Sequence, residues 1–223
     1  MPRFVIVLLA LLGNLSVCPG AGVSAEIVTT QDKSDTRTTL EVDWSAQNST
    51  LLSVPLDLGS MDIGRWLENK GLSPLGIHGW SAQTQSYVQL KTLRPGEGFL
   101  LAKGPGKVSI NGVKIVANAV DFPLEKGWNL IGVPYETGIP LATLRIKLNG
   151  VIKAYRPAVE NKWVGGVNTL IDGQMMPVAA DDSATLEPWR GYWLYAYQPC
   201  ILQIPAVKSA DKNTKGNKPA VKR

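Results

Sequence analysis

The fold is decided by two stretches, TLLSVP at residues 50–55 and NLIGVP at residues 129–134. Each is a short apolar run stopped by a proline, which is the pattern of a buried strand that ends where the backbone loses a hydrogen-bond donor. A second match joins LRPGEGF at residues 93–99 to LEPWRGY at residues 186–192. Both copies therefore share a Leu-x-Pro-x-x-Gly-aromatic turn ahead of another apolar strand. Two matches in the same order indicate an internal duplication.

The first copy is predicted to continue from its proline into a short helix. Ser60 can cap this helix, and Gly71 can end it. Between them, Ile63, Trp66 and Leu67 share one face at helical spacing.

The second copy is predicted to hold a corresponding helix that begins at Pro140, because proline is tolerated in a first turn. Leu141, Leu144 and Leu148 recur at helical spacing, and the Asn-Gly pair at 149–150 follows as a stop.

An aromatic pair follows each predicted helix and indicates a hairpin. Trp80 and Tyr87 flank a short polar segment in the first copy, and Tyr155 and Trp163 flank another in the second. The Asn-Gly pair at 111–112 stands between β-branched residues and is predicted to form a two-residue hairpin turn.

These elements predict a mainly β or α+β fold made of two internally duplicated β-rich repeats, each with one short helix. Residues 26–119 form the first repeat, with an additional edge strand at residues 40–44 that alternates with period two. Residues 120–206 form the second repeat, with an insertion at about residues 164–186. Because each unit is small for an independent core, we expect the two to pack with pseudo-twofold symmetry.

The composition fits this class and excludes several others. The 223 residues include 22 glycines and 15 prolines, which favours a turn-rich β architecture. One histidine and two cysteines are too few for a multi-haem protein, a disulfide framework or a zinc ribbon.

Residues 1–25 have the pattern of a secretory signal peptide, with Arg3, an apolar run and Val-Ser-Ala at 23–25. The run is shorter than the roughly 20 residues that cross a bilayer, so we expect no transmembrane segment in the mature chain. Lipid attachment at Cys18 is disfavoured, because the branched Val17 stands where a small residue is expected. The protein is therefore expected to be exported to the periplasm, the cell surface or the medium. If cleavage follows residue 25, only Cys200 remains, and no intrachain disulfide can form.

Residues 207–223 are predicted to be a disordered basic tail, because they contain almost no large apolar residue. The tail carries six basic residues and one acidic residue, an excess as large as the net charge of the whole chain, +5. It either solubilises the chain end or contacts an anionic surface such as lipid head groups or acidic polysaccharide. The basic residues are Lys208, Lys212, Lys215, Lys218, Lys222 and Arg223.

The motif KGWNLIGVP at residues 126–134, followed by GYWL at residues 191–194, resembles a Gly-Trp-Asn-Leu to Gly-Tyr-Trp module of bacterial secreted and cell-surface proteins. The resemblance covers residues 120–205. The first copy departs from it, with Asn48-Ser49 in place of Gly-Trp and Gly98-Phe99-Leu100 in place of Gly-Tyr-Trp. The resemblance implies an accessory, non-catalytic domain, and no catalytic residue carries over from it.

The sequence offers little for catalysis. Cys200 and His78 are the one thiol and the one imidazole of the expected mature chain, and nothing in the spacing brings them together. Cys200 stands beside Ile201 in a predicted strand, where a small buried side chain is its commoner role. A phosphate-binding loop and a nucleophile elbow are both missing from the sequence. We therefore expect no catalytic residue, no metal and no cofactor.

An enzymatic alternative stays open through the acidic residues of the insertion. Asp172, Asp181 and Asp182 could serve an envelope enzyme or its accessory subunit. They could also bind a weak calcium ion or belong to a plain polar loop.

Aromatic residues carry the binding hypothesis, because exposed rings on a secreted β domain can stack on the apolar face of a sugar. Four of them fall on predicted hairpins and turns and are candidate ligand-binding residues, with core packing as their alternative role. The candidates are Trp80, Tyr87, Trp163 and Trp189. The residues expected in the core, at periodic apolar positions, are Trp44, Trp66, Trp128 and Trp193. A specific nucleic-acid site is disfavoured, because the body of the chain is close to neutral.

The sequence thus predicts an exported, non-enzymatic binding or structural module of the bacterial cell envelope, with a surface glycan or a protein as its partner. In a purely structural alternative, Cys200 or an exposed edge strand joins subunits.

Overall fold

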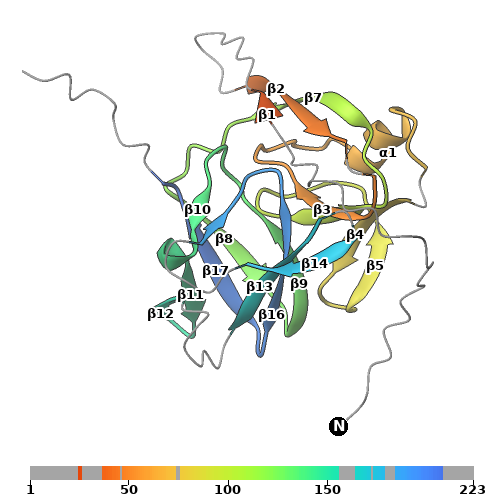
Figure 1. Ribbon diagram of the computed structural model, residues 1–223. Helices are drawn as coiled ribbons and strands as arrows, with labels where there is room; N and C mark the ends of the chain where they lie inside the picture. Colours follow the sequence, from red (N-terminus) through yellow and green to blue (C-terminus); the bar gives the residue numbers. More distant parts are fainter. Residues whose placement is uncertain are drawn as a thin grey trace, which may run out of the picture.

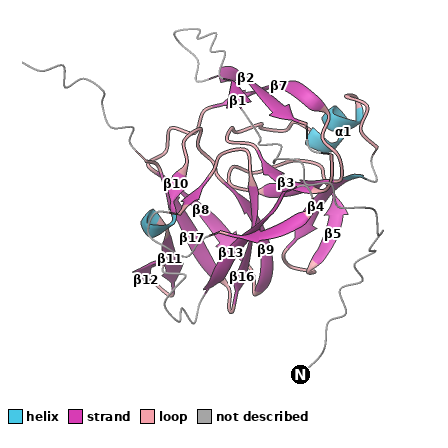
Figure 2. Ribbon diagram, in the orientation of Figure 1, coloured by secondary structure: helices cyan, strands magenta, loops and turns pink. Residues whose placement is uncertain are grey.

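The computed structural model describes residues 25–26, 37–45, 47–73, 76–155, 164–171, 173–178 and 184–207. Within these ranges the protein is mostly β, with several antiparallel sheets and one α-helix (Figures 1 and 2). This confirms the predicted fold class. No helix in the described part of the chain is long and apolar enough to cross a membrane. The expected signal segment up to residue 24 and the basic tail from residue 208 onward lie outside the described residues.

The first half of the chain, residues 26–119, contributes a four-stranded sheet with the strand order β3-β6-β4-β5. A second sheet has the order β1-β2-β7, and it packs with the helix α1 over one face of the first. The elements are β1 (Ala25–Glu26), β2 (Arg37–Trp44), β3 (Thr50–Ser53), α1 (Ile63–Glu68), β4 (Ile77–Ser81), β5 (Ser86–Gln89), β6 (Gly98–Leu101) and β7 (Gly106–Val113).

The second half, residues 120–206, contributes another four-stranded sheet, with the order β9-β16-β13-β14. A further four-stranded sheet, β12-β11-β17-β8, and the two-stranded sheet β10-β15 complete it. The elements are β8 (Ala119–Leu124), β9 (Gly127–Gly132), β10 (Ile139–Pro140), the 3-10 helix η2 (Leu141–Thr143), β11 (Arg145–Leu148), β12 (Val151–Ala154), β13 (Val164–Ile171), β14 (Gln174–Pro177), β15 (Thr185–Leu186), β16 (Gly191–Ala196) and β17 (Cys200–Pro205).

The sheets β3-β6-β4-β5 and β9-β16-β13-β14, which we call the matched sheets, have the same strand order. In each, the first strand along the chain pairs with the last, and the last pairs with the second, which forms a hairpin with the third. The strand before each sheet also pairs with the strand after it, as β2 with β7 and as β8 with β17. The duplication remains a prediction, and this shared order supports it.

Contacts between the halves come in reciprocal pairs. Leu52 forms a β-bridge with Arg190, and Ile131 forms one with Glu97. In the matched sequences Leu52 corresponds to Ile131, and Glu97 corresponds to Arg190. Each bridge from the first half to the second therefore has a counterpart in the opposite direction.

Hydrogen bonds beside these bridges follow the same rule. The N–H of Ser53 donates to the carbonyl of Trp189 (3.1 Å), and the N–H of Gly132 donates to the carbonyl of Gly96 (2.8 Å). Both acceptor residues have a positive φ, +66° at Trp189 and +84° at Gly96. The Leu-x-Pro-x-x-Gly-aromatic turn thus has a residue in the left-handed backbone conformation at the same position in both halves.

The apolar residues form three cores. One is centred in each half, and a smaller third core draws side chains from both matched sheets. The third core contains the buried residues Leu51, Leu130 and Trp193, with Trp80, Leu100 and Leu170 packed against them. The two sheets therefore meet through this cluster, and in Figure 1 the two halves lie side by side.

Helix α1 confirms the predicted first helix, with a different cap. Asp62 is the N-cap instead of Ser60, and its carboxylate accepts the N–H of Arg65 (2.9 Å). Ile63 and Leu67 are fully buried, as their spacing predicts.

The predicted second helix is wrong. Only the three residues of η2 are helical, and residues 145–148 form β11. Leu144, Ile146 and Leu148 are also spaced by two, and this strand period prevails because Ile146 is buried where β11 pairs with β17. The Asn-Gly pair at 149–150 has positive φ at both residues and turns the chain from β11 into β12.

The predicted turn at Asn111-Gly112 is also wrong, because β7 runs straight through both residues and pairs with β2. The Asn111 side chain accepts a hydrogen bond from Thr39 across the strands. A Cβ atom on Gly112 would lie 2.7 Å from Cβ of Leu56. Glycine is needed here for close packing, and no turn forms.

One further expectation needs correction. The strand at residues 40–44 is not an edge strand, because β2 lies between β1 and β7. The hairpin predicted at residues 155–163 lies almost entirely outside the described residues; on either side of it, β12 pairs with β11, and β13 pairs with β14 and β16. The insertion at about residues 164–186 remains a prediction, and the described part of this segment contains β13, β14 and β15.

Candidate functional site

Six aromatic side chains form a continuous row across the boundary between the halves. Each ring meets the next edge to face, with centroid separations from 4.8 Å (Trp80–Trp193) to 6.3 Å (Trp128–Trp193). We call this row the aromatic strip. In order, its rings are Tyr87, Trp80, Trp193, Trp128, Tyr195 and Tyr197.

The strip is anchored in the protein interior at Trp193 and is exposed to solvent at three of its six rings. Trp193 is 8% exposed and belongs to the core between the sheets. Tyr87, Trp128 and Tyr197 are 52%, 42% and 51% exposed. So much exposed ring surface in one row is unusual for side chains whose only role is packing.

Strand alternation places the rings of the second half. Along β16, Tyr192 and Leu194 point into the core of that half, so Trp193 and Tyr195 face the other way. On the neighbouring strand β9, Trp128 lies directly opposite Tyr195. Cross-strand pairing therefore builds this end of the strip.

The first half supplies the other end through its β4–β5 hairpin. Trp80 and Tyr87 are directly opposite each other, and their rings are 5.2 Å apart. Trp80 also packs against Trp193 and donates its indole N–H to the backbone carbonyl of Trp128 (2.8 Å). Trp80 thus joins the two halves by both ring contact and hydrogen bond.

The tip of the same hairpin holds the backbone of Trp128. The side-chain carbonyl of Gln85 accepts the N–H of Trp128 (2.7 Å), and its amide donates to the carbonyl of Trp128 (2.9 Å). Gln85 packs so closely that a Cβ atom on Gly127 would lie 2.5 Å from its side-chain oxygen. The glycine of Gly127-Trp128 is therefore required where the halves meet.

Asn129 holds the turn that leads into Trp128. It is 1% exposed, its side-chain oxygen accepts the N–H of Glu125 (3.0 Å), and its amide donates to the carbonyls of Glu125 (2.9 Å) and Gly127 (3.0 Å). In the Gly-Trp-Asn motif, Gly127 and Asn129 thus shape the backbone, while the ring of Trp128 faces solvent.

The sheets that carry the strip are uncharged. None of the eight strands of the matched sheets contains Lys, Arg, Asp or Glu. Partial burial raises the pKa of Tyr87 above its usual value, so its hydroxyl stays protonated at neutral pH. The strip therefore offers apolar ring surface and neutral hydroxyl groups.

A pocket of about 290 Å³ adjoins the strip at Trp80, which is one of its lining residues. We call it the Trp80 pocket. Arg94, Glu97 and Glu125 also line it, and Arg94 and Glu97 form an ion pair at 3.7 Å. The carboxylate of Glu125 has no hydrogen-bond or ion-pair partner among the described residues. The pocket thus offers an uncommitted acceptor beside an aromatic ring.

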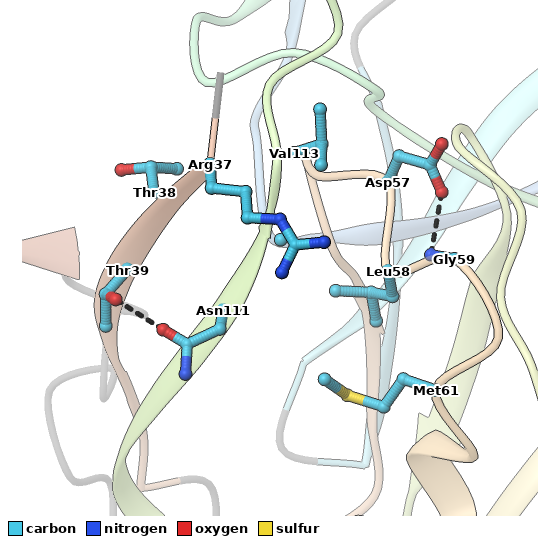
Figure 3. Close-up of a pocket in the computed structure, with 10 residues that line it drawn as sticks. Arg37, Thr38, Thr39, Asp57, Leu58, Gly59, Met61, Asn111 and Val113 are labelled. Atoms are coloured by element: carbon cyan, nitrogen blue, oxygen red, sulfur yellow. Dashed lines mark hydrogen bonds between the residues drawn. The ribbon is translucent and has the colours of Figure 1, made fainter. Parts of the chain in front are cut away.

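A larger pocket, about 470 Å³, lies at one end of β2 and β7 and shares no lining residue with the strip (Figure 3). Arg37 and Asn111 come from the two strands, and Asp57, Leu58 and Met61 come from the segment before α1. Asp57 is engaged locally, because its carboxylate accepts the N–H of Gly59 (2.8 Å). None of the site residues predicted from the sequence lies in this pocket.

Of the predicted ligand-binding residues, the structure brings Trp80 and Tyr87 together. Trp189 is instead 4% exposed, because its left-handed backbone turns the ring into the core of the first half, against Trp44 at 6.3 Å. Trp189 thus lies in a turn, as predicted, and takes the core-packing role that was its alternative. Trp163 lies outside the described residues, as do all six basic residues of the tail.

Among the tryptophans expected in the core, Trp44 and Trp193 are buried and Trp66 is half-buried. Trp128 is 42% exposed and is therefore not in the core, although Leu130 on the same face of β9 is buried. Sequence reasoning also missed Tyr195 and Tyr197. The available signal was the spacing by two of Trp193, Tyr195 and Tyr197, which places all three rings on one face of a strand.

Cys200 and His78 lie in different halves of the protein. Cys200 is buried in the core of the second half, and burial raises the pKa of its thiol. His78 lies on β4 of the first half, with its ring 5.8 Å from Tyr87. In the described part of the chain, no group of three or more His, Cys, Asp or Glu side chains could hold a metal ion. Asp172, Asp181 and Asp182 lie outside it.

Comparisons with protein-family models, with curated proteins and with solved structures find no match for this chain.

Proposed function

We propose that this protein is an exported, non-enzymatic binding module of the bacterial cell envelope, and that the aromatic strip is its binding surface. The observation that carries the proposal is the row of six rings in which Tyr87, Trp128 and Tyr197 remain about half exposed. Aromatic side chains provide large contact areas at low cost in conformational entropy, and they are enriched in binding surfaces.

The sequence supports export to the cell envelope. The pattern of residues 1–25 is that of a secretory signal, and the motifs at 126–134 and 191–194 resemble a module of secreted and cell-surface proteins. The strip adds a role for the tryptophans of those motifs, because Trp128 and Trp193 both belong to it.

We also infer that the two halves are copies of one unit packed about an approximate twofold axis. The shared strand order and the reciprocal bridges of Leu52 with Arg190 and of Ile131 with Glu97 support this inference. The paired arrangement matters for function, because Trp80 and Tyr87 come from one copy and the other four rings from the second. Neither copy alone would hold the strip.

Co-sedimentation of the purified protein with cell envelopes of the bacterium that produces it tests the proposal. The Trp128→Ala variant removes an exposed ring but keeps the backbone hydrogen bonds of residue 128. The control is Ile152→Ala, which removes an exposed apolar side chain on β12, a strand of a different sheet. We expect Trp128→Ala to lower the bound fraction at least about tenfold and Ile152→Ala to leave it unchanged. Equal retention of both variants and the native protein would contradict the proposal.

A further inference from the structure

Resting on the proposed function of the strip, we infer that its ligand is an uncharged saccharide chain, with one unit in the Trp80 pocket. The inference combines the ring row, the lack of charge in the sheets and the polar pocket that adjoins one ring.

The row of rings fits an extended oligomer. A sugar ring presents C–H groups on its faces and hydroxyl groups around its edge, so it can stack on an aromatic ring while its edge remains available for hydrogen bonds. Along the strip, each ring contacts the next from Tyr87 to Tyr197, and Tyr87 also contacts Trp193. The exposed rings of Tyr87, Trp128 and Tyr197 offer separate stacking positions, which suit successive sugar units and give a chain an advantage over a single sugar.

The charges select a neutral ligand. The strands beneath the strip carry no charged residue that could pair with an acidic sugar. In the Trp80 pocket, two carboxylates, Glu97 and Glu125, stand against the one guanidinium of Arg94. This excess of negative charge would repel the carboxylate, sulfate or phosphate groups of an anionic polymer.

The Trp80 pocket supplies the hydrogen bonds that a sugar edge needs. The Glu125 carboxylate has no partner among the described residues, and a charged acceptor of this kind forms strong hydrogen bonds with hydroxyl groups. Trp80 lines the pocket and contacts Trp193 in the strip. One continuous chain can therefore contact the ring row and the pocket together.

The test is a calorimetric titration of the purified protein with the neutral hexasaccharides cellohexaose, chitohexaose and maltohexaose and with the anionic hexagalacturonate, at low and high salt. We expect at least one neutral hexamer to bind with the same affinity at both salt concentrations, and hexagalacturonate not to bind. Trp128→Ala and Glu125→Gln should each weaken that binding about tenfold, and Ile152→Ala should leave it unchanged. Affinity that neither Trp128→Ala nor Glu125→Gln changes would overturn the assignment to this site.

The remaining outcomes separate this inference from the proposed function. If no neutral hexamer binds but Trp128→Ala still abolishes retention on envelopes, the saccharide inference fails and a protein partner at the strip takes its place. If Trp128→Ala changes neither measurement, both proposals fail. Binding of hexagalacturonate that high salt abolishes would overturn the neutral-ligand inference. New reducing ends during the titration would contradict the non-enzymatic role.

Discussion

Gln85 and Trp128 are joined by two hydrogen bonds that run from the side chain of one to the backbone of the other, at 2.7 and 2.9 Å. Gln85 is at the tip of the β4–β5 hairpin in the first half, and Trp128 is the second residue of β9 in the second half. The amide of Gln85 therefore mimics a neighbouring strand for one residue of the other half. Through this contact the first half fixes the position of the most exposed tryptophan of the strip.

Gln85→Ala should loosen this end of the strip. The variant loses both hydrogen bonds to Trp128, and we expect the free energy of unfolding to fall by about 1–3 kcal/mol. The φ of +52° at position 85 is unfavourable for alanine and glutamine alike, so backbone strain does not complicate the comparison. Denaturant unfolding measures the loss of stability. Near-ultraviolet circular dichroism measures the loosening of the aromatic rings. Gln83→Ala, an exposed glutamine in the same turn, is the control, and equal losses in the two variants would disprove the role of Gln85.

Gly98→Ala and Gly191→Ala should destabilise the protein by similar amounts. A Cβ atom on Gly98 would lie 2.7 Å from the carbonyl oxygen of Ile131, and one on Gly191 would lie 2.8 Å from that of Leu52. Both contacts are with backbone and cannot relax cheaply, so we expect a cost of about 1–3 kcal/mol for each, measured by denaturant unfolding.

The control for these glycines is Gly166→Ala on β13, where an added Cβ would meet nothing within 4 Å. It should change stability by less than about 0.5 kcal/mol. A large cost for only one of Gly98 and Gly191 would contradict the reciprocal packing of the halves.

Trp189→Ala and Trp128→Ala should differ sharply in stability. Trp189 belongs to the second half in sequence but packs in the core of the first, so its truncation leaves a cavity and should cost about 3–5 kcal/mol. Trp128 is 42% exposed and should cost less than about 1.5 kcal/mol. Thermal and denaturant unfolding check the difference. Comparable losses would mean that the ring of Trp128 supports the core.

Stability should fall in alkaline solution through Tyr192. Burial raises the pKa of Tyr192 to about 12, although its hydroxyl also accepts the N–H of Glu187 (2.6 Å). The unfolded chain releases this proton near pH 10, whereas the folded protein keeps it. The contribution of Tyr192 is thus fully present below about pH 10 and is lost as the pH rises toward about 12, at up to about 1.4 kcal/mol per pH unit.

Unfolding free energies of the native protein and of Tyr192→Phe across this range measure the contribution. The native protein should lose stability more steeply with pH than the variant. Parallel curves for the native protein and Tyr192→Phe would show that Tyr192 is not the group responsible.

Local patterns with one interpretation were predictable from the sequence. The apolar runs before Pro55 and Pro134 are confirmed as β3 and β9, and the apolar face around Ile63 is confirmed in α1. In these segments the local spacing of the apolar residues predicts the same element that buries them in the core.

Some local patterns are compatible with two structures. Residues that are distant in sequence but close in space determine which of the two forms. The two Asn-Gly pairs illustrate this point. At 149–150 the pair forms a hairpin turn, whereas at 111–112 it continues a strand because β2 pairs along its whole length and Leu56 leaves no room for a side chain. The same dipeptide therefore has opposite roles.

The site was half predictable for the same reason. Trp80 and Tyr87 were found because both lie on one local hairpin. Trp128 and Tyr195 face each other only through the pairing of β9 with β16, which are distant in sequence. Trp189 was named a candidate for ligand binding, but its ring packs in the core of the first half, which its local sequence does not reveal.

The central claim is that the partner of this protein covers the aromatic strip. Hydroxyl-radical footprinting read by mass spectrometry, with and without bound envelope fragments, tests it most directly. We predict that binding slows oxidation of Tyr87, Trp128 and Tyr197, whereas Met175 and Met176, exposed on β14 outside the strip, react at unchanged rates. Protection of the two methionines with no protection of the three aromatic residues would contradict the account.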